Sequence, residues 1–177
     1  LSDVDEIIDS RYSDKIISEV KKRGIITIPI RFSLFYLNLF AKNWSGPANY
    51  SYRIFIMTGY HFNKLKYKSD KLRKQGESGY LIDKVYCFPE FAGFHHSWLG
   101  DKWFVKNKIE SYAHDNADHD PRLFNNGVVN MNFVEKCLKN GVSIFGDGYE
   151  LEINNDVATL ESIAELGVDK IDSLFIK

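Results

Sequence analysis

Three carboxylates stand within four residues near the start of the chain, in the segment Ser2-Asp3-Val4-Asp5-Glu6-Ile7. In an extended backbone successive side chains point to opposite faces, so Asp3 and Asp5 would share one face and Glu6 would take the other. Two carboxylates on one face suit a hard divalent cation whose other positions hold water and substrate phosphates. The same residues could instead begin a helix, because carboxylates near a helix N-terminus interact favourably with its dipole.

Histidines in two later segments could add ligands to this site or form another. His95 and His96 are neighbours in the segment Gly93–Trp98, and an imidazole combined with carboxylates suits manganese or zinc. Each could equally be a structural residue with hydrogen-bonded ring nitrogens. His114 and His119 stand among three aspartates, a pattern that predicts either a second metal site or a solvated acidic loop.

Composition limits the class of protein without indicating a partner. The chain has 177 residues, of which 44% are hydrophobic and 15% aromatic, enough for one domain with a buried core. The 23 lysines and arginines nearly balance the 24 aspartates and glutamates, so no overall field favours nucleic acid or an anionic membrane. No segment is long and apolar enough to span a bilayer. Cys87 and Cys137 are far apart in sequence, which favours reduced thiols and leaves a single disulfide open.

The first half of the chain predicts a helix followed by strands. Helical spacing predicts a helix over Ser13–Arg23, capped by Asp14 and ended by Gly24. Its inward face would carry Ile16, Ile17 and Val20. Residues 25–40 predict one or two strands, with Pro29 at a bulge or an edge. A loop over 43–49, a buried strand over 52–57, a polar run over 64–75 and a further strand over 79–88 follow.

The second half predicts mainly helices. Asp101 would cap a helix reaching about Ala113. Its inward residues would be Trp103, Ile109 and Tyr112, and its lysines would lie largely outside. Further helices are expected over Met131–Leu138, ended by Gly141, and over Val157–Leu166, ended by Gly167.

Five pieces of the sequence stand in an order that has a known counterpart. They are the acidic segment Ser2–Ile7, the segment Phe35-Tyr36-Leu37-Asn38-Leu39, the loop Trp44-Ser45-Gly46-Pro47, the segment Ala92–Gly100, and the run from Lys106–Ile109 through Ser111-Tyr112-Ala113-His114 to Asn140–Gly146. This order resembles glycosyltransferase family 17, named for the β-1,4-mannosyl-glycoprotein N-acetylglucosaminyltransferase that adds bisecting GlcNAc. The resemblance covers about residues 2 to 146, and the shared order is more specific than any one piece.

The resemblance implies an α/β fold of the GT-A type, a mixed sheet flanked by helices. It assigns residues 1–146 to the acceptor-side part of the catalytic domain and 147–177 to a C-terminal extension of that domain, with the nucleotide-binding half expected before residue 1. It also implies a metal-dependent, inverting transfer of a sugar, GlcNAc by analogy, from a nucleotide donor to a glycan acceptor. We expect a UDP-sugar donor, no nucleic-acid partner, and a cytoplasmic location rather than the Golgi lumen.

The same resemblance suggests roles for single residues. Asp3 and Asp5 would hold Mn²⁺ or Mg²⁺ against the donor diphosphate, with His95 as a further ligand. An inverting transfer needs a base at the acceptor hydroxyl, and Glu90 and Asp101 flank the histidine segment as candidates. Their alternative roles are a surface carboxylate and a helix N-cap. Candidates for substrate binding are Tyr36, Asn38, Trp44, Trp98 and His114, of which Tyr36 and Trp98 could stack on a sugar or belong to the core.

Two other classes of function fit the same residues. A metal-dependent phosphohydrolase or nuclease would use the carboxylates and histidines to activate water, and its basic run over Lys64–Arg73 would face nucleic acid. A non-catalytic glycan-binding module would use the aromatic residues and would bind sugar without metal.

Overall fold

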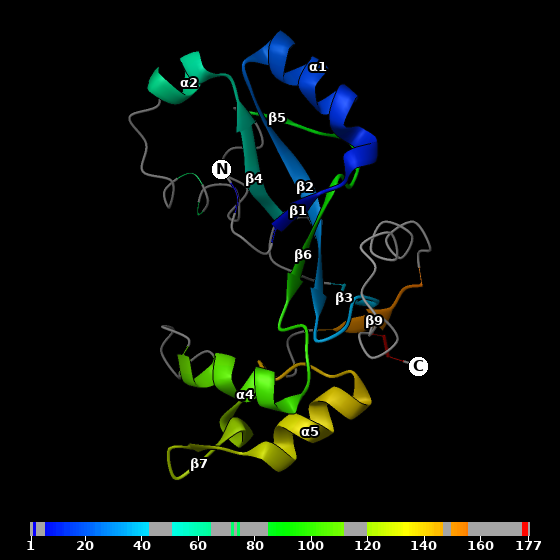
Figure 1. Ribbon diagram of the computed structural model, residues 1–177, viewed down its shortest axis with the longest axis vertical. Coiled ribbons are helices and arrows are strands. Elements are labelled where there is room, and N and C mark those ends of the chain that lie inside the picture. The colour runs from blue at the N-terminus through cyan, green and yellow to red at the C-terminus, as the bar shows by residue number, and fades with distance from the viewer. Residues whose placement is uncertain are drawn as a thin grey trace. The chain divides into compact units, whose positions relative to one another are not determined.

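The computed structural model describes residues 2, 6–42, 51–64, 72, 74, 85–111, 120–146, 150–155 and 175–176 (Figure 1). The chain is a mixed α/β protein with a mixed sheet flanked by helices. It divides into two compact units. Unit 1 comprises Leu1–Phe32 and Trp44–His95, and unit 2 comprises Ser33–Asn43 and His96–Lys177.

The sheet of unit 1 is built around β2 (Ile25–Leu34), whose last residues belong to unit 2. β4 (Ser51–Met57) pairs with β2 antiparallel and β5 (Tyr86–Cys87) pairs with it parallel, so the sheet is mixed. β1 (Glu6–Ile8) pairs antiparallel with β6 (Gly93–Ser97), which neighbours β2. The sheet therefore brings the strand that begins within the acidic segment next to the strand that carries the histidines.

The predicted strand region divides into β2 and β3 (Leu39–Ala41), one of the two expected arrangements. The register of β2 against β4 shifts between Ile28 and Ile30, so of the two predictions for Pro29, a bulge or an edge position, the structure favours the bulge. The buried strand predicted over 52–57 is confirmed as β4.

The segment from Phe35 to Asn38 forms a turn rather than the predicted strand. Phe35 has a φ of +65°, which interrupts the extended backbone, and the Tyr36 amide donates to the Leu34 carbonyl at 2.7 Å. The expectation of an aromatic strand is therefore wrong for these residues, and only Leu39 belongs to a strand.

Helix α1 (Ser13–Arg23) has the predicted bounds, and Gly24 ends it with a φ of +83°. This left-handed conformation lets the Gly24 amide donate to the Val20 carbonyl at 2.7 Å. The predicted cap at Asp14 is wrong. A short 3-10 helix, η1 (Ser10–Tyr12), leads directly into α1, so Asp14 lies in the first turn of α1.

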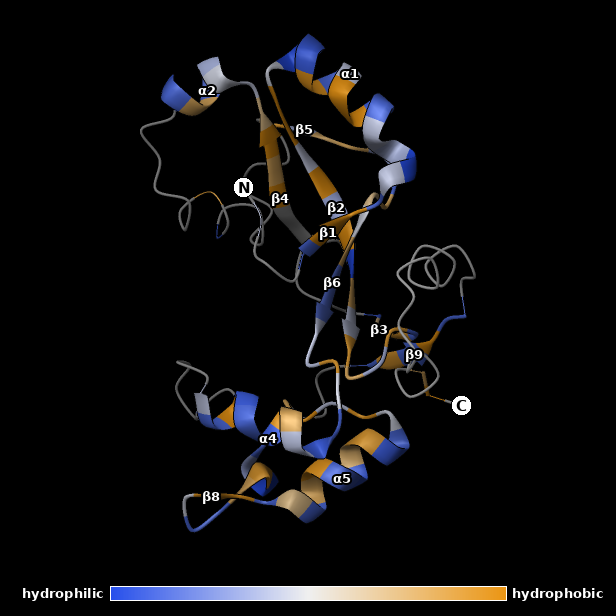
Figure 2. Ribbon diagram, in the orientation of Figure 1, coloured by the Kyte–Doolittle hydropathy of each residue, from blue (hydrophilic) through white to orange (hydrophobic). Residues whose placement is uncertain are grey.

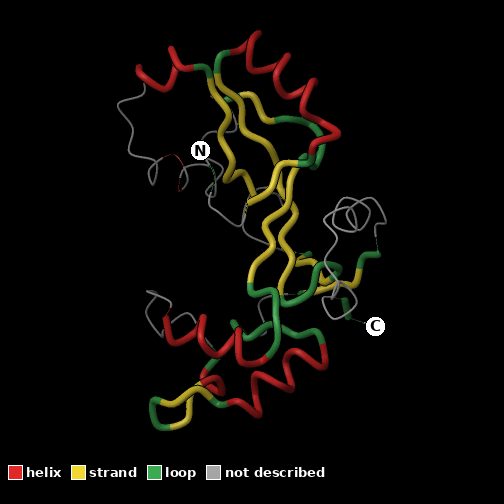
Figure 3. The backbone as a smooth tube through the Cα atoms, in the orientation of Figure 1, coloured by secondary structure: helices red, strands yellow, loops and turns green. Residues whose placement is uncertain are grey.

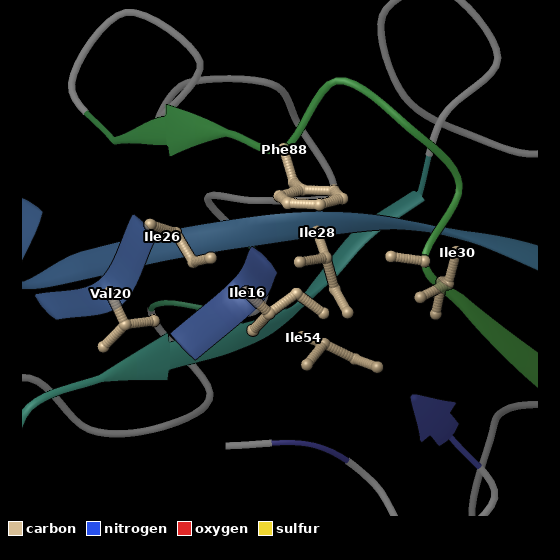
Figure 4. Packing of buried hydrophobic residues seen from close by; sticks show 8 residues of the cluster. Ile16, Val20, Ile26, Ile28, Ile30, Ile54 and Phe88 are labelled. Atoms are coloured by element: carbon tan, nitrogen blue, oxygen red, sulfur yellow. The ribbon is translucent and has the colours of Figure 1, made fainter. Parts of the chain in front are cut away.

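Helix α1 packs its apolar face on the sheet of unit 1 (Figure 4). Ile16 and Val20 are buried, as predicted, whereas Ile17 is 50% exposed and its predicted inward position is wrong. The buried side chains labelled in Figure 4 are Ile16, Val20, Ile26, Ile28, Ile30, Ile54 and Phe88. Burial contributes about 1.5–3 kcal/mol for each large apolar side chain, so this cluster contributes substantially to the stability of unit 1. Helix α2 (Gly59–Lys64) follows β4.

In unit 2, helix α4 (Lys102–Ser111) packs against α5 (Met131–Asn140) (Figure 3). β3 pairs with the Ser33 end of β2 and with β9. The shorter elements of this unit are η4 (Pro121–Leu123), β7 (Phe124–Asn125), β8 (Val128–Val129) and β9 (Leu151–Ile153).

Helices α4 and α5 each carry both hydrophobic and hydrophilic residues (Figure 2). Gly141 ends α5 in the left-handed conformation, as predicted, with a φ of +59°. In α4, Ile109 is buried as predicted, but Trp103 is 57% exposed, so its predicted inward position is wrong.

Several predictions lie outside the described residues, namely the loop over 43–49, the helix over 157–166 and most of the segments 64–75 and 79–88. None of the described helices is long and apolar enough to cross a membrane. Cys87 and Cys137 both carry thiols, which confirms the expectation of reduced cysteines for this structure.

Candidate functional site

Strand β1 places a carboxylate opposite a histidine. In the antiparallel ladder between β1 and β6, Glu6 is the partner of His95, and Ile8 is the partner of Gly93. Directly opposed residues project to the same face, with Cβ atoms about 4.5–5.5 Å apart. Glu6 and His95 are both buried, with 7% and 6% of their surface exposed. The interior of unit 1 therefore holds a carboxylate and an imidazole on one face of the sheet.

Gly93 allows the strands around this pair to approach each other. A Cβ atom at Gly93 would lie 2.7 Å from the carbonyl oxygen of Ile7 and 2.8 Å from Cγ2 of Ile30. Both distances are shorter than ordinary van der Waals contact, so a side chain at this position would push β1 or β2 away. The glycine of the histidine motif thus has a structural function in placing Glu6 against His95.

The two histidines of β6 point to opposite faces of the strand. The His95 ring meets the Phe32 ring edge to face, with centroids 5.0 Å apart and an interplanar angle of 84°. His96 Nδ1 and Ser33 Oγ lie 2.7 Å apart in a hydrogen bond. His96 therefore has the contact expected of a structural histidine, whereas His95 shares its face with Glu6.

Four of the predicted site residues, Asp3, Asp5, Trp44 and His114, lie outside the described residues. Within the described ranges, no three histidine, cysteine, aspartate or glutamate side chains gather closely enough to hold a metal ion. That finding covers Glu6 and His95 but does not include the two aspartates of the expected metal site.

Both candidate bases make structural contacts. The Glu90 carboxylate accepts a hydrogen bond from the Lys15 ammonium of α1, and this contact raises the pKa of Lys15. Asp101 Oδ1 accepts hydrogen bonds from the amides of Trp103 and Phe104, at 3.0 and 2.9 Å, so Asp101 is the N-cap of α4. The helix predicted to start at Asp101 is confirmed. Both carboxylates also reach solvent, as a base for a substrate hydroxyl must.

Asn38 is buried, and its side chain connects the turn after β2 to the C-terminal part of unit 2. Its Nδ2 donates to Asn155 Oδ1 at 2.8 Å and to the Ile176 carbonyl at 3.0 Å, and its Oδ1 accepts from the Ile176 amide at 3.1 Å. An amide engaged in this way does not present a polar atom to a sugar. The neighbouring Tyr36 is half-buried, and burial raises the pKa of its phenol.

Trp98 lies in the interior of unit 2 at the end of β6. Only 3% of its surface is exposed, and its ring packs edge to face against Phe145 with centroids 5.5 Å apart. In this position the ring belongs to the core and offers no open face to a sugar. Trp98 also has a φ of +63°, which is unusual for a bulky residue. It follows Ser97, whose carbonyl accepts a hydrogen bond from the Phe35 amide at 3.1 Å.

The lysine-bearing helix brings a cation to this end of β6. Lys108 Nζ donates to Ser97 Oγ at 3.4 Å and lies 5.0 Å from the centroid of the Trp98 ring. Lys108 is half-buried, so its predicted outside position is wrong. Its spacing could have indicated this, because Lys108 stands three residues after the buried Val105 on the same face of α4.

Glu6 was not singled out as a site residue by its sequence context, because its position depends on a register between distant strands. The pair that it forms with His95 offers oxygen and nitrogen donors of the kinds that Mn²⁺ accepts. A buried carboxylate also favours a cation or hydrogen-bond donors beside it, since an ionised group is costly to bury alone. The residues present therefore fit one side of a divalent-cation site. Neither a family model nor a curated protein nor a solved structure matches this chain.

Proposed function

We propose that this chain is part of a metal-dependent, inverting glycosyltransferase of the GT-A type. It would transfer a sugar, GlcNAc by the resemblance to family 17, from a UDP-sugar to a glycan acceptor. The observation that carries the proposal is the pairing of Glu6 with His95, because it joins two of the five motif-like pieces across a strand ladder. Motifs that match only by chance have no reason to meet in the fold.

In this proposal Asp3, Asp5 and His95 hold the metal ion, Mn²⁺ or Mg²⁺. When bound, such an ion stabilises the negative charge that develops on the leaving diphosphate. The Phe32 ring packs against His95 and fixes the direction of the imidazole. Burial of Glu6 and His95 also excludes water from one side of the site.

The register sets a condition on the two aspartates. β1 begins at Glu6, and Glu6 shares the face of His95. A strand that continued backward through Asp5 would point that side chain to the opposite face. The metal set therefore requires a turn immediately before Glu6, which is where the GT-A resemblance expects one.

The base of the proposed reaction is Glu90 or Asp101, and the structural contact of each carboxylate competes with proton uptake at the oxygen it engages. Glu90 contacts Lys15, and Asp101 contacts the N-terminus of α4. Asparagine caps helices about as well as aspartate but is not a base. Asp101→Asn therefore separates the two roles of Asp101: lost transfer with an intact fold would assign the base, and unchanged transfer would leave Asp101 only as a cap.

The metal site can be tested by Mn²⁺ binding, followed by electron paramagnetic resonance, and by binding of a panel of nucleotide sugars with and without Mn²⁺. Asp5→Asn and His95→Gln should each abolish Mn²⁺-dependent binding. His96→Gln is the matched control, because it changes the adjacent histidine on the opposite face, and it should retain binding. If Asp5→Asn still bound Mn²⁺ and Glu6→Gln did not, the metal ligands would be Glu6 and His95 in place of the proposed Asp3, Asp5 and His95.

The same assays distinguish the other classes of function. Release of phosphate from phosphate esters without an acceptor would indicate a phosphohydrolase or nuclease. Glycan binding that is unaffected by Mn²⁺ and by Asp5→Asn would indicate a non-catalytic module. We further propose a cytoplasmic location, which the thiols of Cys87 and Cys137 support, since cytosolic proteins keep their cysteines reduced.

A further inference from the structure

Unit 2 contains a pocket of about 420 Å³ that includes none of the residues proposed for sugar transfer. One face of α5 forms a wall, with Phe133, Lys136, Cys137 and Asn140 spaced as successive turns of a helix require. Arg122, Val142, Ser143 and Gly146 also line the pocket. Small-molecule pockets usually have volumes of about 300–1,000 Å³, so this one is large enough for a compact organic ligand.

Part of the pocket lining is uncharged. Cys137 is 1% exposed, and its thiol contacts the Ser143 carbonyl at 3.8 Å. Burial raises the pKa of the Cys137 thiol to about 11, so the sulfur stays protonated at neutral pH and is a neutral surface for a ligand. Phe133 and Val142 add further apolar surface to the lining.

Among the described residues of the lining, those that carry a charge are the cations Arg122 and Lys136. Arg122 is held in place by Asp120, which accepts hydrogen bonds from Nε at 2.8 Å and from Nη2 at 2.5 Å. The guanidinium also lies over the Phe133 ring, 5.0 Å from its centroid. Lys136 forms no ion pair with any carboxylate in the part of the chain that the structure describes. Its ammonium can therefore bind an anion without first leaving a protein carboxylate.

We propose that this pocket binds a small organic oxyanion, a phosphate or carboxylate group carried on a compact body with an apolar face. The oxyanion contacts the Lys136 ammonium beside Arg122. A hydrogen bond between an ammonium or guanidinium group and an oxyanion is stronger than one between neutral groups. The body of the ligand covers Cys137 and Val142, and the Asn140 amide hydrogen-bonds a polar substituent. This site is independent of the proposed transfer site, and its existence does not require the transferase activity.

Ligand-observed NMR and calorimetry on the full 177-residue chain test the proposal with four probes. These are phenyl phosphate, glucose 6-phosphate, benzoate and the neutral benzyl alcohol. Phenyl phosphate or benzoate should bind, and benzyl alcohol should bind much more weakly. A preference for phosphate over carboxylate, or the reverse, would identify the anionic group. The proposal is overturned if no anionic probe binds, or if benzyl alcohol binds as tightly as the anions.

Variants locate the binding within the pocket. Lys136→Gln should weaken binding of the anionic probe about tenfold, equivalent to about 1.4 kcal/mol, because the variant loses a charge-assisted hydrogen bond to the anion. Lys139→Gln is the matched control, since it removes the same charge from an exposed position of α5 outside the lining, and it should bind like the parent. Arg122 is left unchanged because its removal would leave the buried Asp120 carboxylate without its cation.

A second variant tests occupancy without changing any charge. Val142→Tyr enlarges a side chain that lines the pocket and is 47% exposed, so the fold should tolerate it while the ligand is excluded. Equal affinities in Lys136→Gln and Lys139→Gln, or unchanged binding in Val142→Tyr, would place the anion elsewhere and overturn the proposal.

Discussion

Replacing Asn38 by alanine should destabilise unit 2, because this buried amide connects three parts of the chain. The variant loses the hydrogen bonds to Asn155 Oδ1 and to the carbonyl and amide of Ile176. A hydrogen bond contributes about 0.5–1.5 kcal/mol net, so three of them amount to roughly 3 kcal/mol. For a protein of this length each kcal/mol changes the melting temperature by about 2–4 °C, which predicts a decrease of roughly 6–12 °C.

The assay combines thermal unfolding with hydrogen exchange. The Ile176 amide donates to Asn38 Oδ1, so its protection from exchange should fall in Asn38→Ala. Asn125→Ala, in the β7–β8 hairpin, is the control because the Asn125 side chain is exposed. A double-mutant cycle with Asn155→Ala should give a coupling energy of at least about 0.5 kcal/mol, as expected for residues in contact.

This prediction also decides between two roles for Asn38. A residue that binds a sugar would lose glycan affinity on substitution while the fold kept its stability. A residue that anchors the C-terminal part of unit 2 would lose stability and protection together. The anchoring role would be refuted if Asn38→Ala and Asn125→Ala had the same melting temperature and the Ile176 amide exchanged at an unchanged rate.

Two further predictions concern the strand contact in unit 1 and the ion pair beside the pocket. Gly93→Ala should lower stability by about 1–3 kcal/mol in urea unfolding, because its Cβ would lie 2.7 Å from a backbone oxygen. Gly59→Ala, whose Cβ would meet nothing within 4 Å, should be neutral, and equal midpoints for the two variants would contradict the contact. Hydrogen bonds from the Arg122 side chain hold the pKa of Asp120 in the folded protein below its usual value. The pair therefore stabilises the fold at pH values above the pKa of Asp120 in the unfolded chain, about 3.9, and this stabilisation is lost as the pH falls through the pKa of the folded state. Asp120→Asn should therefore lower stability at pH 6 and flatten its decline below about pH 4, and an unchanged slope would show that Asp120 does not titrate in this way.

Local signals in the sequence predicted the elements that depend on a few neighbouring residues. Gly24 and Gly141 ended the predicted helices because each helix ends with a residue at positive φ, a conformation that glycine adopts without strain. Pro29 indicated the bulge in β2 because proline cannot donate a ladder hydrogen bond. Asp101 indicated the start of α4 because its carboxylate accepts hydrogen bonds from the first amides of that helix.

The failures depend on contacts between distant parts of the chain. Trp103 is hydrophobic at a helical spacing, yet it lies on the face of α4 that packing leaves exposed. Asn38 follows an aromatic segment that looks extended, but it lies in a turn that its buried amide ties to Ile176. A local sequence pattern cannot predict contact with a residue that lies more than a hundred positions away in the chain.

The same difference explains why the candidate site was predicted in part. Without the resemblance, the sequence singled out His95 and His96 together and gave no reason to prefer either one. The ladder between β1 and β6 makes that distinction, since it sets Glu6 opposite His95 and leaves His96 with Ser33. A slip of one residue in this register would exchange the two faces. Gly93, which allows the close approach of β1, therefore helps to set which of the two histidines faces Glu6.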